Sequence, residues 1–135
     1  MPATPKQILK RFVDQAWNKK NRKAVHELLT ADCRHYMPGL GEPMIGPDAY
    51  LQLLDQFTAA FPDCRMEIGL SFGEGTHVCL MWTFKGSHKA AFHDFTPSGK
   101  VISIAGVVVA TIRRGKIVEI HSMFDNAEFA SKLTA

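Results

Sequence analysis

The segment Val101–Ile112 restricts the fold of this chain more than any other part of the sequence. It carries no charged side chain and is rich in β-branched residues, so we expect a strand whose two faces are both covered by protein, ligand or a partner subunit. The segment is too short to span a bilayer as a helix. Gly106, near its middle, marks a bend or bulge that would curl the sheet. The sequence therefore predicts a curved sheet built around this strand.

Three amphipathic helices are predicted, all before the main run of strands. Apolar residues recur at helical spacing from Pro5 to Trp17, again from Ala24 to Leu29, and a third time from Pro47 to Phe61, where Pro62 ends the helix. The predicted strands are one short segment at 33–37 and then 66–73, 77–86, 100–112 and 116–124. Helices followed by strands indicate an α+β domain, in which an antiparallel sheet carries helices on one face.

This α+β arrangement predicts both a pocket and an interface. A curled sheet closed by three N-terminal helices leaves a cone-shaped apolar pocket, which is a usual place for a small apolar ligand. Helices can cover only one face of the sheet, so the other face is a natural surface for a homodimer. With 135 residues, the chain is expected to form a single domain over residues 1–135.

The charge and cysteine content argue against several classes of function. The net charge is only +3 and the Lys and Arg residues are scattered, which predicts neither a nucleic acid nor a membrane as partner. No apolar signal region opens the sequence, and the three cysteines, an odd number at wide spacing, fit reduced thiols. We therefore expect a cytoplasmic protein.

Asp125 is the strongest candidate for chemistry, because it directly follows the apolar strand 117–124. In an apolar pocket, desolvation would raise the pKa of its carboxyl group and let the group exchange protons near neutral pH. The alternative is structural, since Asp125 and Asn126 are both favoured as caps for the C-terminal segment 127–133. The residue types leave both interpretations open.

Three histidines are considered as partners for that carboxyl group. His121 shares a face of the last strand with Asp125, but four residues of strand separate the two by about 13 Å, which is too far for a hydrogen bond. His88 ends an otherwise apolar strand face, and His35 stands at the start of a loop rich in Pro and Gly. Each histidine either assists in acid–base chemistry or has a structural role.

Neither a metal nor a cofactor is expected. His88 could join His93 and Asp94 as metal ligands, but a loop separates them and no His-Glu-x-x-His spacing occurs. Phosphate-loop and dinucleotide-binding fingerprints are also absent from the sequence. A small apolar molecule is the expected ligand, and its predicted contacts are Trp17, His35, Tyr36, Phe57, Phe61, Trp82, Val107, Val109, Met123 and Phe124.

Five short segments, spread in order over nearly the whole chain, carry a family resemblance. They are Phe61-Pro62-Asp63, Trp82-Thr83 with Gly86-Ser87-His88, Thr96-Pro97-Ser98-Gly99-Lys100, Gly115-Lys116-Ile117-Val118-Glu119, and Asp125. Together they resemble the SnoaL-like polyketide cyclases, the ester cyclase branch of the superfamily named after nuclear transport factor 2. The resemblance implies a cone-shaped, usually dimeric α+β barrel with a deep apolar pocket. It also implies that Asp125 is the general acid/base of an intramolecular aldol closure without cofactor or metal, and that His88 faces the pocket.

The sequence departs from related patterns at several positions. His121 stands where family members commonly have Trp, and Met81 where they have Arg, so the pocket is expected to differ in shape and electrostatics. His121 could therefore act as a second acid/base or bind a substrate oxygen. The related ketosteroid isomerases use a carboxylate near the position of His35-Tyr36, which this chain lacks. Epoxide hydrolases of this fold use an Arg and two Asp, and the central strand here has no Arg-x-Asp.

We therefore expect a cofactor-independent cyclase or isomerase acting on a small apolar carbonyl compound such as a polyketide. Asp125 is the predicted acid/base, with His88, His121 or His35 assisting. Two alternatives stay open: a non-catalytic ligand-binding or dimerisation module on the same fold, and a hydrolase of an epoxide or ester that activates a water molecule. A buried Asp would serve ligand binding as well as catalysis, so these functions are not separated at this stage.

Overall fold

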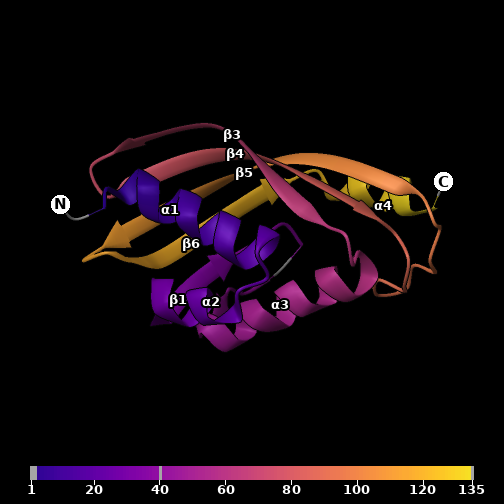
Figure 1. The fold of residues 1–135 in the computed structure, drawn as a ribbon, viewed down its shortest axis with the longest axis horizontal. Coiled ribbons are helices and arrows are strands. Elements are labelled where there is room, and N and C mark those ends of the chain that lie inside the picture. The colour runs from indigo at the N-terminus through magenta and orange to yellow at the C-terminus, as the bar shows by residue number, and fades with distance from the viewer. Residues whose placement is uncertain (1–2, 40, 135) are drawn as a thin grey trace.

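The computed structural model describes residues 3–39 and 41–134. Helices lie against one side of a curved six-stranded sheet, and the last helix lies at the end of the sheet opposite to the N-terminus (Figure 1). The elements in chain order are α1 (Pro5–Val13), η1 (Asp14–Asn18), α2 (Arg22–Leu28), β1 (Leu29–Tyr36), β2 (Met44–Ile45), α3 (Gly46–Ala60), β3 (Arg65–Glu74), β4 (His77–Ser87), β5 (Val101–Arg113), β6 (Lys116–Phe124) and α4 (Asn126–Thr134).

The first helix starts at a capping box and turns its apolar side towards the sheet. The Thr4 hydroxyl accepts a hydrogen bond from the backbone N–H of Gln7 at 3.2 Å, and the Gln7 side chain accepts one from the Thr4 N–H at 2.9 Å. Pro5 takes the first helical position, where no N–H is needed. The chain continues into the π-helical turn η1, which buries Trp17. The apolar face predicted from Pro5 to Trp17 is thus confirmed, with a wider turn at its end.

The long helix α3 also packs its apolar side towards the sheet. It begins at Gly46, whose φ of +85° favours glycine and whose added Cβ would lie 2.8 Å from the carbonyl oxygen of Ala31. Its last helical residue is Ala60, with Phe61 as C-cap, because Pro62 disfavours a helical conformation at the residue before it. The buried side chains on its inner face are Tyr50, Leu51, Leu54, Phe57 and Ala60.

The sheet is mixed, and the prediction of an antiparallel sheet is wrong at one pairing. The strand order is β2-β1-β6-β5-β4-β3, and β1 runs parallel to β6 while the other neighbours are antiparallel. The chain leaves β1, crosses through α3, and returns through three antiparallel pairings that bring β6 back beside β1. The parallel pairing of Leu29 with Ile117 also starts β1 four residues before the predicted Cys33.

Gly106 is needed for close packing and not for a bulge. The register between β4 and β5 is continuous at this point, where Gly106 pairs with Trp82, so the predicted bulge does not occur there. An added Cβ at Gly106 would lie 2.2 Å from Cζ2 of Trp82 and 2.7 Å from the carbonyl oxygen of Met123. The Trp82 indole therefore lies directly over the glycine, on the side of the sheet that faces the helices.

The two faces of the sheet differ in what covers them. On the helix side the strands bury their side chains, as with Leu80, Phe84 and Ile104. On the outer side Met81 and Met123 remain about half exposed, at 46% and 50%. Both pair with Val107 of β5, so they form one apolar row across three strands. The homodimer expected through this outer face stays a prediction.

The described residues contain no helix that is long and apolar enough to cross a membrane.

Replacing Gly106 with Ala is expected to destabilise the fold. The new methyl group has no space beside the Trp82 indole, and overpacking of this kind costs about 1–3 kcal/mol in the free energy of unfolding. Urea unfolding followed by circular dichroism measures the change. Gly41→Ala is the matched control, because an added Cβ at Gly41 meets no atom within 4 Å. Equal stability of the two variants would contradict this account of Gly106.

Candidate active site

An apolar cavity lies between the helices and the inner face of the sheet. The enclosed part of the cavity has a volume of about 60 Å³, and one side of it is open. This enclosed volume is well below the roughly 300–1,000 Å³ of a usual ligand pocket, so only a small, compact molecule suits the site. The lining residues are Leu9, Phe12, Val13, Trp17, His35, Met37, Tyr50, Leu53, Phe57, Met66, Trp82, Phe84, Ile104, Val108, Ile120, Ser122, Phe124 and Phe129.

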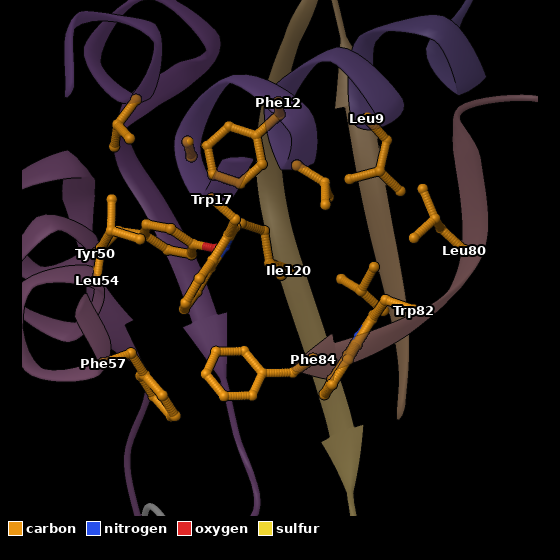
Figure 2. Close-up of a cluster of buried hydrophobic side chains, with 14 of the residues drawn as sticks. Leu9, Phe12, Trp17, Tyr50, Leu54, Phe57, Leu80, Trp82, Phe84 and Ile120 are labelled. Carbon is orange, nitrogen blue, oxygen red and sulfur yellow. The ribbon is translucent and has the colours of Figure 1, made fainter. Parts of the chain in front are cut away.

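Side chains from both layers point into this region (Figure 2). Phe12 and Trp17 come from the first helical segment, and Tyr50 projects from α3 towards Trp17. Phe57, also from α3, packs between Trp17 and Phe84. The sheet supplies the opposite wall of the cavity, which includes Trp82. The prediction of an apolar pocket between the helices and the curved sheet is therefore confirmed.

His35 and Ser122 form a polar pair in this otherwise apolar wall. The Nε2 atom of His35 lies 2.9 Å from the hydroxyl oxygen of Ser122. The two residues come from the parallel pair β1 and β6, in which His35 is in register with Ile120. Alternation along β6 then points Ile120, Ser122 and Phe124 to the same inner side.

The environment of His35 keeps its imidazole ring neutral. Burial is the main cause that lowers the pKa of His35 from 6.5 to about 4, and electrostatic repulsion by His121 contributes in the same direction. The ring packs against Tyr50 with the two centroids 5.1 Å apart. Its Nδ1 atom is buried and has no hydrogen-bond partner among the described residues. At neutral pH the ring thus offers one N–H and one lone pair.

A second polar pair joins the two helical walls. The indole N–H of Trp17 donates a hydrogen bond of 2.8 Å to the hydroxyl oxygen of Tyr50. Burial raises the pKa of Tyr50 well above its ordinary value, an effect that the Trp17 hydrogen bond opposes only in part. The phenol therefore stays protonated at physiological pH.

The structure places Asp125 outside the cavity. Its carboxylate is exposed and accepts a hydrogen bond of 3.0 Å from the backbone N–H of Glu128. Its carbonyl oxygen accepts another from the N–H of Phe129. Asp125 is thus the N-cap of α4, so the expectation of a buried carboxyl group in an apolar pocket is wrong. The reason lies in strand alternation, since Asp125 follows the outward-facing series of β6 while Phe124 points inward.

His88 is fully buried but does not line the cavity. Its Nδ1 accepts a hydrogen bond from the backbone N–H of Ser98 at 3.2 Å, which fastens the connection between β4 and β5. Its ring stacks on Phe61 at 5.2 Å, and Phe61 packs against Phe84 at 5.3 Å. Phe61 therefore comes between His88 and the cavity wall, and the expectation that His88 faces the pocket is wrong.

His121 points to the outer side of the sheet. Its Nε2 lies 3.1 Å from a carboxylate oxygen of Glu119, and its ring stacks on Tyr36 with the centroids 4.5 Å apart. It is half-buried and is not part of the cavity lining. Glu119, His121 and Met123 alternate with the inward-facing Ile120, Ser122 and Phe124, so this part of β6 turns His121 away from the pocket.

Half of the predicted ligand contacts line the cavity. These are Trp17, His35, Phe57, Trp82 and Phe124. The other predicted contacts do not line it, because strand alternation turns most of them to the outer side and Phe61 lies behind Phe84: they are Tyr36, Phe61, Val107, Val109 and Met123.

Two polar groups of the site, Ser122 and Tyr50, were not predicted from the sequence. Ser122 carried a usable signal, because it is the one hydroxyl in the otherwise apolar series Val118, Ile120 and Phe124. Tyr50 looked like an ordinary core residue of a helix, and its bond to Trp17 joins positions 33 residues apart. The described residues contain no group of three or more His, Cys, Asp or Glu side chains placed to hold a metal ion.

Comparisons with known proteins identify the family. The protein-family description that matches is "SnoaL-like polyketide cyclase", over residues 7–133. That match spans most of the chain, and the chain therefore belongs to the SnoaL-like polyketide cyclase family. No curated protein sequence gives a significant match.

Solved structures agree on the fold. A proposed SnoaL-like polyketide cyclase from Jannaschia sp. CCS1 has a TM-score of 0.88 at 18% identity, over 100% of this chain and 98% of that one. IdmH, a proposed polyketide cyclase from Streptomyces antibioticus, has a TM-score of 0.87 at 20% identity, over 98% and 100%. An NTF2-like protein of unknown function from Burkholderia pseudomallei has a TM-score of 0.79 at 18% identity, over 98% and 100%. The chain thus has the α+β fold of nuclear transport factor 2.

Acid is expected to destabilise the protein through His35. Its pKa is about 6.5 in the unfolded chain and about 4 in the folded one, so between these pH values the unfolded state binds the additional proton. At 1.36 kcal/mol per pKa unit, the neutral ring contributes about 3 kcal/mol to the free energy of unfolding. This contribution is fully present above pH 6.5 and is lost as the pH falls to 4. Urea unfolding of wild type and His35→Gln across this range measures the difference. His77→Gln, at an exposed histidine, is the control and should keep the pH dependence of wild type. If the free energy of unfolding of His35→Gln falls with pH as steeply as that of wild type, the burial of a neutral His35 ring is contradicted.

Removal of the Asp125 carboxylate is expected to weaken the start of α4. Asp125→Ala leaves the N–H of Glu128 without its partner and should lower the free energy of unfolding by about 1 kcal/mol. Asp125→Asn keeps a side-chain oxygen in place and should remain close to wild type. Denaturant unfolding of both variants measures this. If Asn destabilises as much as Ala, the capping role is refuted.

Proposed function

We propose that this protein is a cofactor-independent cyclase or isomerase of the SnoaL-like type, acting on a small, mostly apolar carbonyl compound. The observation that carries the proposal is the buried imidazole of His35, paired with the Ser122 hydroxyl in the wall of an apolar cavity. A neutral imidazole in such a site can exchange protons with a bound carbon acid away from bulk water.

His35 is the proposed general base, at its Nε2 atom. This role requires the tautomer with the ring proton on Nδ1, in which Nε2 accepts a hydrogen bond from the Ser122 hydroxyl before substrate binds. The substrate C–H bond breaks and its proton goes to Nε2. The electron pair of that bond forms the enolate C=C bond, and the carbonyl π pair moves to the oxygen.

The enolate then has two productive fates. In a cyclisation, its carbon forms a C–C bond with a second carbonyl carbon of the same molecule, and the alkoxide takes a proton from the imidazolium. In an isomerisation, the imidazolium returns the proton to a different carbon. The apolar walls contribute by holding the flexible substrate in the conformation that reacts.

The low pKa of His35 narrows the substrate class. A base whose pKa is about 4 is weak, so it removes protons efficiently only from acidic carbons. Carbons between two carbonyl groups, or between a carbonyl group and an aromatic ring, meet this requirement. The narrow cavity adds the requirement that the substrate be compact. Compact 1,3-dicarbonyl compounds and α-aryl ketones are therefore the proposed substrates.

Hydrogen–deuterium exchange into 2-tetralone tests this proposal without knowledge of the natural substrate. Its carbon 1 lies between a carbonyl group and an aromatic ring, and proton NMR in D₂O follows the loss of its signal. Wild type is expected to accelerate exchange at least 100-fold over buffer, within the range usual for a positioned acid or base, and His35→Gln should remove roughly 100-fold. The rate should be constant above pH 5 and fall as the pH approaches 4, because His35 becomes protonated there.

Two controls separate the competing assignments. His77→Gln replaces an exposed histidine outside the cavity and should exchange like wild type. Asp125→Asn keeps the helix cap and should also exchange like wild type. Loss of exchange in Asp125→Asn would transfer the acid/base role back to that carboxyl group. Tight binding of 2-tetralone without any exchange would instead support the ligand-binding module, and exchange that survives in His35→Gln would overturn the role of His35.

A further inference from the structure

The Tyr50 hydroxyl has one hydrogen-bonding capacity that the protein leaves unused. An indole N–H can only donate, so in the Trp17–Tyr50 hydrogen bond the phenol oxygen is the acceptor. The phenol O–H proton must then find an acceptor elsewhere. Among the residues that the structure describes, none accepts a hydrogen bond from it. The hydroxyl therefore keeps a free donor although the side chain is buried.

The surroundings of this hydroxyl direct the donor to the cavity. Tyr50 is itself a lining residue, and Figure 2 shows its ring pointing from α3 towards Trp17. The edge of the ring packs against Phe12 at 5.1 Å, which offers no conventional acceptor. The other neighbouring ring is His35, also at 5.1 Å. A molecule in the cavity thus lies within reach of both the proposed base and the free phenol donor.

The Trp17 hydrogen bond makes Tyr50 a better donor. A hydroxyl whose oxygen accepts a hydrogen bond becomes more polarised, so its own proton forms a stronger hydrogen bond. Trp17 is held in place by edge-to-face contacts with Phe57 at 5.6 Å and Phe84 at 6.2 Å. The orientation of the Tyr50 oxygen is therefore fixed before a ligand arrives, which is the condition for strong electrostatic stabilisation in a site that excludes water.

We propose that the Tyr50 hydroxyl donates a hydrogen bond to the carbonyl oxygen of the bound substrate and stabilises the enolate oxygen that forms there. The assignment rests on the proposed function and adds a second catalytic residue to it. As the C–H bond breaks and its proton moves to His35, the carbonyl π pair moves to the oxygen, which gains negative charge. Tyr50 keeps its proton throughout and contributes only the hydrogen bond. Trp17 acts as a positioning residue for Tyr50.

The arrangement also specifies the ligand. The molecule needs one oxygen acceptor at Tyr50 and an acidic C–H group near His35, on a framework that is otherwise apolar. 2-Naphthol is a planar mimic of the enol of 2-tetralone and places an oxygen where the enolate oxygen would lie. 2-Methylnaphthalene has almost the same shape without the oxygen. The pair therefore isolates the contribution of the hydrogen bond from that of the apolar contacts.

Calorimetric binding of these two probes to wild type and Tyr50→Phe tests the proposal. Loss of one neutral hydrogen bond should raise the Kd of 2-naphthol about tenfold and change the Kd of 2-methylnaphthalene by less than about twofold. His77→Gln, at an exposed position outside the cavity, is the control and should leave both Kd values close to those of wild type. Equal weakening of both probes, or no weakening, would overturn the role of Tyr50 as an oxygen donor.

The infrared carbonyl band of bound 2-tetralone gives a measurement that does not depend on a variant. In wild type the band should lie below its position in hexane, because a hydrogen bond from Tyr50 weakens the C=O bond, and in Tyr50→Phe it should move back. A wild-type band at the hexane position would overturn the proposal even if Tyr50→Phe does not fold. The two proposals fail separately: absence of exchange refutes His35 catalysis, whereas the probe ratio and the carbonyl band report on Tyr50 alone.

Discussion

The packing of aromatic side chains between the helices and the sheet is the constraint on which the rest of this structure depends. Trp17 contacts Phe57 of α3 and Phe84 of β4 edge-to-face, and its N–H bonds to Tyr50. The Trp82 indole packs against Gly106 on the inner side of the sheet, where the glycine leaves room for it. Large rigid rings hold the two layers apart and fill the space between them incompletely. The cavity is the result of this spacing.

The polar groups inside that apolar layer are few and paired. A buried polar group without a partner is costly, so each needs a hydrogen bond or a functional reason for lacking one. Trp17 satisfies its N–H on Tyr50, and His35 Nε2 is in contact with Ser122. These pairs leave a donor on Tyr50 and a titratable ring with a lowered pKa at one cavity. The apolar surroundings that form the pocket are thus also the cause of the perturbed acid–base properties of its polar residues.

Much of the fold was predictable, whereas only part of the site was. The helical spacing around Phe12 and Phe57 and the family segments indicate helices packed on a curved sheet, and the structure agrees. The prediction that Asp125 lies in the pocket was wrong for a local reason. A position after an apolar strand fits a pocket carboxylate and a helix cap equally well, and in the structure the carboxylate caps α4 by accepting a hydrogen bond from the Glu128 N–H. The prediction that His88 faces the pocket was wrong for a tertiary reason, because no residue near it in the sequence indicates that Phe61 separates it from the cavity.

The sequence by itself determined the apolar faces of the elements, the order of helices and strands, and the family, because periodicity and short motifs are local properties of the chain. Tertiary structure alone decided which side of each strand became the inner one, that β1 lies parallel to β6, and which polar residues meet. His35 and Ser122 stand 87 positions apart, and Trp17 and Tyr50 stand 33 apart. Contacts at such separations depend on how the layers pack around the aromatic rings, and no local pattern encodes that packing.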